Sequence, residues 1–130
     1  MIFLETSFII NYYVSKIDNH EKAKEIFKEI EKKPKCISET TIYETLTVLR
    51  KLKQDETLIK KVYNDLTNSE DITVFEDVHL YEKALDYTLN HNKIGFFDNL
   101  SYIVMKENNI KTIASFDSDF DNKEGIVRIH

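Results

Sequence analysis

The sequence has little of the material that cross-links or interrupts a chain, with one cysteine, one proline and two glycines among 130 residues. A single cysteine, Cys36, cannot form an internal disulfide and is too few for a zinc site. Because almost no linker composition is present, we expect one domain over residues 1–130. No apolar run approaches the roughly 20 residues that span a membrane, so we expect no membrane partner.

Signals for secretion and for nucleotide binding are also missing. The segment 1–10 has no basic leader, carries Glu5 inside its apolar stretch and lacks a small-residue cleavage site, which favours a cytoplasmic protein. The absence of a Gly-rich phosphate loop argues against a nucleotide-driven enzyme. The net charge of −5 argues against a protein that binds phosphates through charge alone.

The hydrophobic residues, 42% of the chain, are sufficient for a buried core and repeat at regular spacing. Helical spacing predicts helices over residues 8–14, 20–33, 38–52, 56–67, 78–89 and 97–107. Short apolar and β-branched runs predict strands over residues 2–4, 36–37, 72–75, 110–116 and 126–129. Strands separated by helices imply parallel pairing, so we expect an α/β fold: a three-layer α/β/α sandwich with a short, mainly parallel central sheet.

Four carboxylates fall at the ends of these expected elements. Glu5 follows the first strand and Asp117 follows the strand at 110–116, while Glu44 and Asp98 lie in the first turns of their helices. Because sites in open parallel sheets form outside the carboxyl ends of the strands, we expect these four side chains to converge at one edge.

Convergence of four carboxylates requires a counter-charge, because like charges repel strongly. Mg²⁺ or Mn²⁺ would supply it through oxygen ligands, and could polarise a phosphodiester and activate a water. Each acid also has a purely structural interpretation: a helix-dipole or cap residue at Asp98 and Asp117, an exposed helix acid at Glu44, and a strand-end charge at Glu5.

Four segments of the sequence form an ordered set of motifs. They are Phe3-Leu-Glu-Thr-Ser-Phe-Ile-Ile, Ser38-Glu-Thr-Thr-Ile-Tyr-Glu-Thr-Leu, Gly95-Phe-Phe-Asp-Asn-Leu-Ser-Tyr and Ile113-Ala-Ser-Phe-Asp-Ser-Asp-Phe. In order and spacing this set resembles the PIN domain family (PilT N-terminal domain). Its closest likeness is to the VapC-type ribonuclease toxins of toxin–antitoxin systems, and it covers nearly the whole chain.

The resemblance implies a metal-dependent endoribonuclease with an acidic quartet that uses Mg²⁺ or Mn²⁺. The family's four acids match Glu5, Glu44, Asp98 and Asp117, and a further acid often present near the site matches Asp119. The resemblance therefore implies Glu5, Asp98, Asp117 and Asp119 as metal ligands. Small hydroxyl residues of the family match Thr6, Ser7 and Ser115 as supporting groups.

The resemblance also implies partners: an RNA substrate, a second copy in a homodimer, and a small antitoxin protein bound in an apolar groove. The candidate antitoxin contacts are Tyr12, Tyr13 and Val14, although core packing is the favoured role for at least one of them. Lysines between positions 22 and 35, and the run Arg50-Lys-Leu-Lys53, could contact RNA phosphates or simply form solvated helix faces.

One residue departs from the family pattern, since the first acid is Glu5 where the family almost always has Asp. Two alternatives stay open: a PIN-type RNA-processing nuclease without an antitoxin, and a catalytically weakened PIN scaffold. A calcium-loop interpretation of residues 117–128 fails, because an EF-hand needs Gly at the sixth position and Glu at the twelfth, which are Asn122 and Arg128 here.

Overall fold

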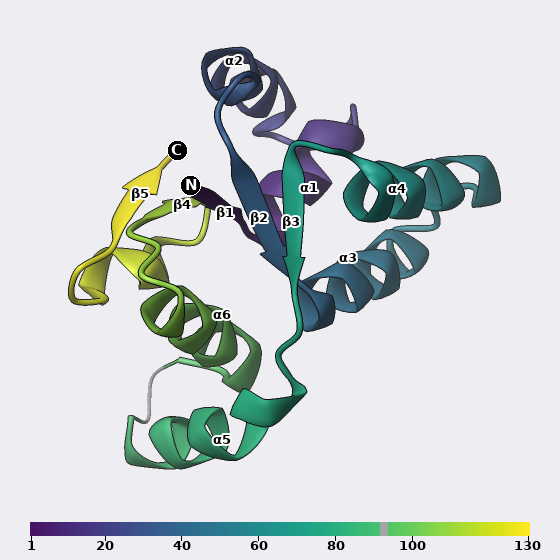
Figure 1. Ribbon diagram of the computed structural model, residues 1–130. Coiled ribbons are helices and arrows are strands. Elements are labelled where there is room, and N and C mark those ends of the chain that lie inside the picture. The colour runs from purple at the N-terminus through teal and green to yellow at the C-terminus, as the bar shows by residue number, and fades with distance from the viewer. Residues whose placement is uncertain (92–93) are drawn as a thin grey trace.

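A five-stranded sheet whose strands all run parallel forms the middle of the molecule (Figure 1). The structure is a computed structural model of residues 1–130, and it describes residues 1–91 and 94–130. In spatial order the strands are β3 (Ile72–Phe75), β2 (Lys35–Ser38), β1 (Ile2–Leu4), β4 (Thr112–Ala114) and β5 (Val127–Ile129).

In the described part of the chain, six α-helices and two short 3₁₀ helices connect the strands. They are α1 (Thr6–Tyr13), α2 (His20–Ile30), α3 (Glu39–Lys51), α4 (Glu56–Asn68), η1 (Val78–Leu80), α5 (Tyr81–Asn90), α6 (Phe96–Glu107) and η2 (Ser118–Asn122). Figure 1 shows α1 to α4 on one side of the sheet and α5 and α6 on the other. Among the described residues, no helix combines the length and apolarity that crossing a bilayer would require.

The alternation of side chains along the strands builds two cores, one on each face of the sheet. In β1, Ile2 and Leu4 pack with residues of α1 to α4, whereas Phe3 packs with residues of α5 and α6. Cys36 is fully buried in the core that contains Phe3, on the side of α5 and α6. The three-layer α/β/α prediction is confirmed, and the sheet is parallel throughout rather than mainly so.

Helix α1 begins two residues before the expected start at Phe8. Its N-cap is Glu5, whose side chain accepts a hydrogen bond from the backbone N–H of Ser7, so neither Thr6 nor Ser7 is the cap. A glutamate at the N-cap can in this way reach forward to the first turn and pair one of its free amides. The first acid of the chain is therefore also the N-cap of its first helix.

Helix α2 ends at Ile30, before the expected limit at residue 33 and before Pro34. Lys35 closes this end of the helix, since it is only 3% exposed and donates from Nζ to the carbonyl oxygens of Ile30, Glu31 and Lys33. Ile30 is the last residue of α2 and Glu31 is its C-cap, so the ammonium bonds to carbonyl oxygens at and just beyond the helix end. The expectation that Lys35 could reach an RNA phosphate is therefore wrong, because its ammonium is buried in a cap.

Two element boundaries and the burial of one side chain also differ from the predictions. Residues 78–80 form the 3₁₀ helix η1 rather than the first turn of an α-helix, and β4 is shorter than the expected strand at 110–116. Ile110 lies outside β4 because its N–H bonds to Met105 O and so completes the end of α6. Helical spacing over 97–107 predicts that Phe97 faces inward with Leu100 and Val104, but Phe97 is 49% exposed. Phe96 is the first-turn residue that packs, against Tyr81.

Candidate metal centre

The carboxyl ends of the parallel strands gather polar residues at one edge of the sheet. Glu5 follows β1, Ser38 ends β2, Asp77 follows β3, and Ser115 and Asp117 follow β4. Parallel strands place all these ends on the same side, which is where sites form in open α/β sheets. The first turn of α6, with Asp98, begins near this edge.

Three aspartates come together there. Asp98, Asp117 and Asp119 each offer a carboxylate oxygen, and these oxygens lie within 4.8 Å of one another. Asp98 comes from the first turn of α6, whereas the other two come from the segment after β4. Segments distant in the sequence therefore place three oxygen ligands around one point.

Hydrogen bonds between backbone N–H groups and side-chain oxygens hold Asp117 and Asp119 in place. Asp117 is the N-cap of η2, and its Oδ1 accepts the backbone N–H of Asp119 at 2.9 Å. The backbone N–H of Asp117 donates in turn to Ser115 Oγ at 3.0 Å. Asp117 is thus both a cap, as its structural interpretation suggested, and a member of the acidic group.

The acidity of Asp98 is strongly perturbed. Burial raises its pKa most, and together with the charges of Glu5, Asp117 and Glu44 and a hydrogen bond with Asp117 it brings the pKa to about 8. A carboxyl group with this pKa holds its proton at neutral pH unless a cation neutralises the surrounding charge. The surroundings of Asp98 therefore carry too little positive charge to balance the nearby carboxylates.

Glu5 is 5% exposed and is held by hydroxyl groups rather than by cations. Its Oε2 accepts hydrogen bonds from Ser115 Oγ at 2.7 Å, from the N–H of Ser7 at 3.0 Å and from the Ser7 hydroxyl. Burial raises the pKa of Glu5 above its ordinary value, and these hydrogen bonds oppose the rise. Glu5 is outside the tight group of three aspartates, but its charge acts on Asp98.

Glu44 projects from the second turn of α3 and is half-buried. Thr6 Oγ1 donates a short hydrogen bond to Glu44 Oε1, which joins α3 to α1. Burial raises the pKa of Glu44, whereas the bond from Thr6 lowers it. Like Glu5, Glu44 lies outside the three-aspartate group and yet raises the pKa of Asp98 through its charge.

The three hydroxyl residues Thr6, Ser7 and Ser115 therefore each serve an acid. Ser7 Oγ also lies 3.2 Å from Ser115 Oγ and accepts the N–H of Phe116 at 2.9 Å, so it ties α1 to the end of β4. Hydrogen bonds to a charged acceptor are stronger than those between neutral groups. The hydroxyls stabilise Glu5 and Glu44 without contributing a positive charge.

Arg128 is a neighbour of the site that the sequence did not indicate. From β5 it binds Asp121 through two parallel bonds, Nε to Oδ1 at 2.7 Å and an η nitrogen to Oδ2 at 2.8 Å. Its other η nitrogen donates to the carbonyl oxygen of Ser115 at 3.2 Å. A single arginine in a weak strand gives no pattern by which sequence reasoning could assign this contact.

The donor set fits a hard divalent cation. Mg²⁺ binds oxygen ligands at about 2.0–2.1 Å and Ca²⁺ at about 2.3–2.6 Å, so oxygens around one ion lie within a few ångströms of one another. The oxygens of Asp98, Asp117 and Asp119 have this spacing. Because no histidine or cysteine belongs to the group within the described residues, the chemistry favours Mg²⁺ or Mn²⁺ over zinc.

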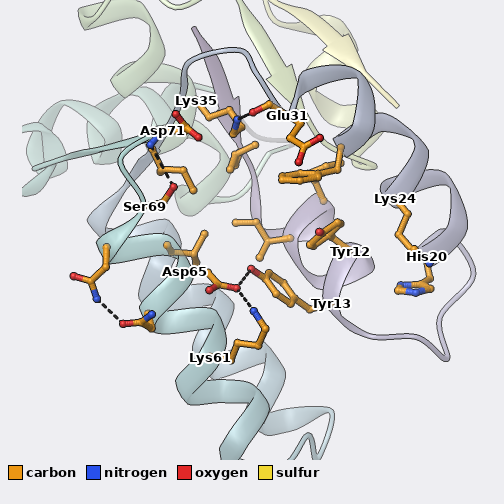
Figure 2. Close-up of a pocket in the computed structure, with 18 residues that line it drawn as sticks. Tyr12, Tyr13, His20, Lys24, Glu31, Lys35, Lys61, Asp65, Ser69 and Asp71 are labelled. Carbon is orange, nitrogen blue, oxygen red and sulfur yellow. Dashed lines mark hydrogen bonds and ion pairs between the residues drawn. The ribbon is translucent and has the colours of Figure 1, made fainter.

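A separate cavity of about 670 Å³ lies between α1, α2 and α4 (Figure 2). Its apolar wall includes Phe8, Ile9, Tyr12 and Phe27, and none of the acids discussed above lines it. Tyr13 also lines it and donates to Asp65 Oδ2 at 2.6 Å, as Figure 2 shows. Of the three candidate antitoxin contacts, Tyr12 and Tyr13 line this cavity. Val14 is 4% exposed and packs in the core instead.

Comparisons with known proteins agree with this fold. The model of the PIN domain family matches residues 2–126. The crystal structure of Mycobacterium tuberculosis VapC20, a sarcin-ricin loop cleaving toxin, is similar with a TM-score of 0.89 and 23% identity, over 99% of this chain and 98% of that one. No match was found among curated proteins.

Two further solved structures share the fold at lower similarity. A toxin–antitoxin complex from Klebsiella pneumoniae has a TM-score of 0.68 and 14% identity, over 98% of this chain and 96% of that one. FitAcB from Neisseria gonorrhoeae has a TM-score of 0.68 and 16% identity, over 100% of this chain and 97% of that one.

The raised pKa of Asp98 predicts how stability depends on pH without metal. An unfolded aspartate ionises near its ordinary value of 3.8, whereas folded Asp98 keeps its proton up to about pH 8. The folded state binds more protons between these values, so stability falls as pH rises through this range. We expect Asp98→Asn, which cannot ionise, to unfold at a higher temperature than the parent in chelator, with the difference growing from pH 5 to pH 8.

Thermal unfolding followed by circular dichroism would measure this difference. The matched control is Asp86→Asn, which changes an exposed aspartate on α5. We expect no growing difference for that variant. An Asp98→Asn curve parallel to the parent curve from pH 5 to pH 8 would show that Asp98 does not carry the buried charge.

Proposed function

The chain belongs to the PIN domain family, and from this membership we propose that it is a metal-dependent endoribonuclease that cleaves RNA phosphodiesters. The observation that carries the proposal is the group of oxygens from Asp98, Asp117 and Asp119 within 4.8 Å of one another. The pKa of Asp98, raised by burial and by neighbouring carboxylates, supports it because a dication would supply the missing charge.

Each residue of the site has a proposed role. Asp98, Asp117 and Asp119 hold the ion, Glu5 adds negative charge and a fourth ligand, and Glu44 holds the ion directly or through water. A bound Mg²⁺ or Mn²⁺ would polarise the phosphodiester and lower the pKa of an attacking water. In this proposal Asp117 also orients that water. Thr6, Ser7 and Ser115 keep Glu44 and Glu5 in position through the hydrogen bonds described above.

We further propose that the protein is the toxin of a VapBC-type pair with a small antitoxin. The cavity beside Tyr12 and Tyr13 supports this, because its apolar wall and charged rim, with Lys24 and Lys61, suit an amphipathic segment of a partner. The similar solved structures include a toxin–antitoxin complex. An RNA-processing nuclease without an antitoxin is the alternative, and a small DNA-binding protein encoded beside this gene would argue against it.

The catalytic proposal predicts that cleavage of a structured RNA needs a divalent cation and Asp98. We expect cleavage with Mg²⁺ or Mn²⁺ and none after chelation. We also expect Asp98→Asn to slow cleavage by about 100-fold or more, the scale of losing an electrostatic group at a reacting centre. Initial rates on end-labelled RNA measure both effects, and Asp86→Asn is the control that should cleave like the parent. Cleavage that persists in chelator would contradict the proposal.

Glu5 provides a test of the family's first position. We expect Glu5→Gln to weaken metal binding and slow cleavage about tenfold or more, because it removes a buried negative charge near the ion. Glu5→Asp keeps the charge in the shorter side chain usual in the family. We therefore expect it to retain or raise the rate with Mg²⁺, whose octahedral geometry is strict.

Rates of the parent, Glu5→Asp and Glu5→Gln with each metal distinguish three cases. If Glu5→Gln cleaves as fast as the parent, the metal site consists of the remaining acids and Glu5 has no role in it. Failure of all three to cleave any RNA would favour the weakened-scaffold alternative.

A homodimer is the last part of the proposal. Val78, Tyr81, Leu85 and Leu89 are exposed and share one side of η1 and α5, at helical spacing. Exposed Phe97, next to Asp98, adds to the apolar surface of this half of the molecule. An apolar stripe of this kind suits self-association, and a second copy is the occupant we propose.

The dimer proposal predicts that charge on this stripe separates the copies. We expect the parent to sediment as a dimer at micromolar concentration and Leu85→Asp to sediment as a monomer, because a buried unpaired charge opposes association. The neighbouring variant Asp86→Lys, off the stripe, should remain dimeric. A parent chain that is monomeric at these concentrations would show that the stripe is not a dimer interface.

A further inference from the structure

A buried lysine connects the two segments that carry the three aspartates. Lys123 follows η2, the segment that begins with Asp117 and contains Asp119, and it is only 6% exposed. Its Nζ donates to Asn99 Oδ1 at 2.8 Å, and Asn99 is the residue next to Asp98 on α6. The bond therefore joins the segment that carries Asp117 and Asp119 to the helix that carries Asp98.

The surroundings of the ammonium are unusual for a buried charge. The rings of Tyr87 and Tyr102 lie 4.6 Å and 4.9 Å from Nζ, and the Tyr87 hydroxyl lies 3.4 Å away. None of the ion pairs within residues 1–91 and 94–130 includes Lys123. Ring faces and a carbonyl oxygen stabilise a cation less than a carboxylate does, so burial of this charge is costly.

Asn99 is itself fixed in one orientation. It is fully buried, and its Nδ2 donates to Thr88 Oγ1 at 3.0 Å and to the carbonyl oxygen of Ile94 at 3.1 Å. Because an ammonium can only donate, the oxygen of the amide must face Lys123. A flipped amide would set two donors against each other, so the contact has one possible geometry.

Apolar packing already joins the same elements. Phe120 of η2 is fully buried in a core with Leu100 and Val104 of α6. A neutral side chain at position 123 could extend that packing without the cost of burying a charge. What the ammonium adds is a directional bond to the neighbour of Asp98.

We propose that Lys123 is a positioning residue, whose bond to Asn99 fixes the separation of Asp98 from Asp117 and Asp119 and thereby sets the affinity for the divalent cation. The inference rests on the proposed metal-dependent function. Groups that orient metal ligands without touching the ion typically change metal affinity 10- to 100-fold, and octahedral Mg²⁺ or Mn²⁺ is sensitive to misplaced oxygens.

The test is the affinity for Mn²⁺, measured without RNA from the electron paramagnetic resonance signal of free Mn²⁺. Lys123→Met keeps the length and apolar contacts of the side chain and removes the charge and the donor. We expect its dissociation constant for Mn²⁺ to rise about tenfold or more. Lys123→Gln keeps a shorter, neutral donor. It provides a milder second variant should Lys123→Met not fold, with a smaller rise expected.

The matched control is Lys35→Met, because Lys35 is also a buried lysine held by carbonyl oxygens, at the amino end of β2. We expect Lys35→Met to lower the unfolding temperature and leave Mn²⁺ affinity unchanged, which separates lost stability from lost positioning. Folded Lys123→Met or Lys123→Gln that binds Mn²⁺ like the parent would overturn this inference alone. A parent that binds no Mn²⁺ would overturn the proposed function and this inference with it.

Discussion

Repulsion among carboxylates at one edge of the sheet is the constraint on which the rest of this structure depends. Asp98, Asp117 and Asp119 present oxygens within 4.8 Å of one another, and the charges of Glu5 and Glu44 also act on Asp98. Such an arrangement is unfavourable by itself, as the pKa of about 8 at Asp98 indicates. It persists because two apolar cores and a parallel sheet fix the backbone that carries it. The folding energy of the whole domain holds a local cluster of charge in place.

The groups around the acids limit this repulsion without neutralising it. Hydroxyls of Thr6, Ser7 and Ser115 donate to Glu44 and Glu5, and the backbone N–H of Asp119 donates to Asp117. Such donors favour the ionised form of an acceptor, so the outer acids are supported locally. Two cations in this region have other hydrogen-bond partners: Arg128 binds Asp121, although its charge also acts on Asp117, and Lys123 donates to Asn99. The aspartates thus retain a deficit of positive charge that a dication would fill.

The sequence predicted the layers of the fold well, because each depends on local patterns. β-Branched runs marked the strands, helical spacing marked the helices, and the position of acids after strands indicated which edge would carry charge. The parallel topology then follows from helical connections. Asp98, Asp117 and Asp119 could be placed together on this basis, with the family resemblance supplying Asp119. The roles of Glu5, Glu44 and the hydroxyls in binding metal and RNA remain predictions.

The features that the sequence did not reveal depend on contacts between distant segments. Lys35 reads as one of a row of exposed lysines, yet three carbonyl oxygens at the end of α2 bury it. Lys123 reads as part of a charged turn, yet Asn99 and two tyrosine rings enclose it. Phe97 has the spacing of a core residue, but the packing of Phe96 on Tyr81 leaves it outside. Sequence periodicity indicates which residues share one face of an element. The burial of Lys35, Lys123 and Phe97 depends instead on which other segments pack against them.

Glu5 depends both on its local position after a strand and on contacts with a distant segment. A glutamate at the end of a strand can meet a site built for a shorter acid either by displacing the ion or by folding its own side chain. In this structure the side chain folds: Oε2 turns toward the N–H and hydroxyl of Ser7 and the hydroxyl of Ser115, so the added methylene is absorbed within the first turn of α1. The residue thereby serves as a helix cap and keeps its negative charge close enough to act on Asp98. A longer acid at this position is compatible with an intact cluster, because neighbouring hydroxyls determine where its carboxylate lies.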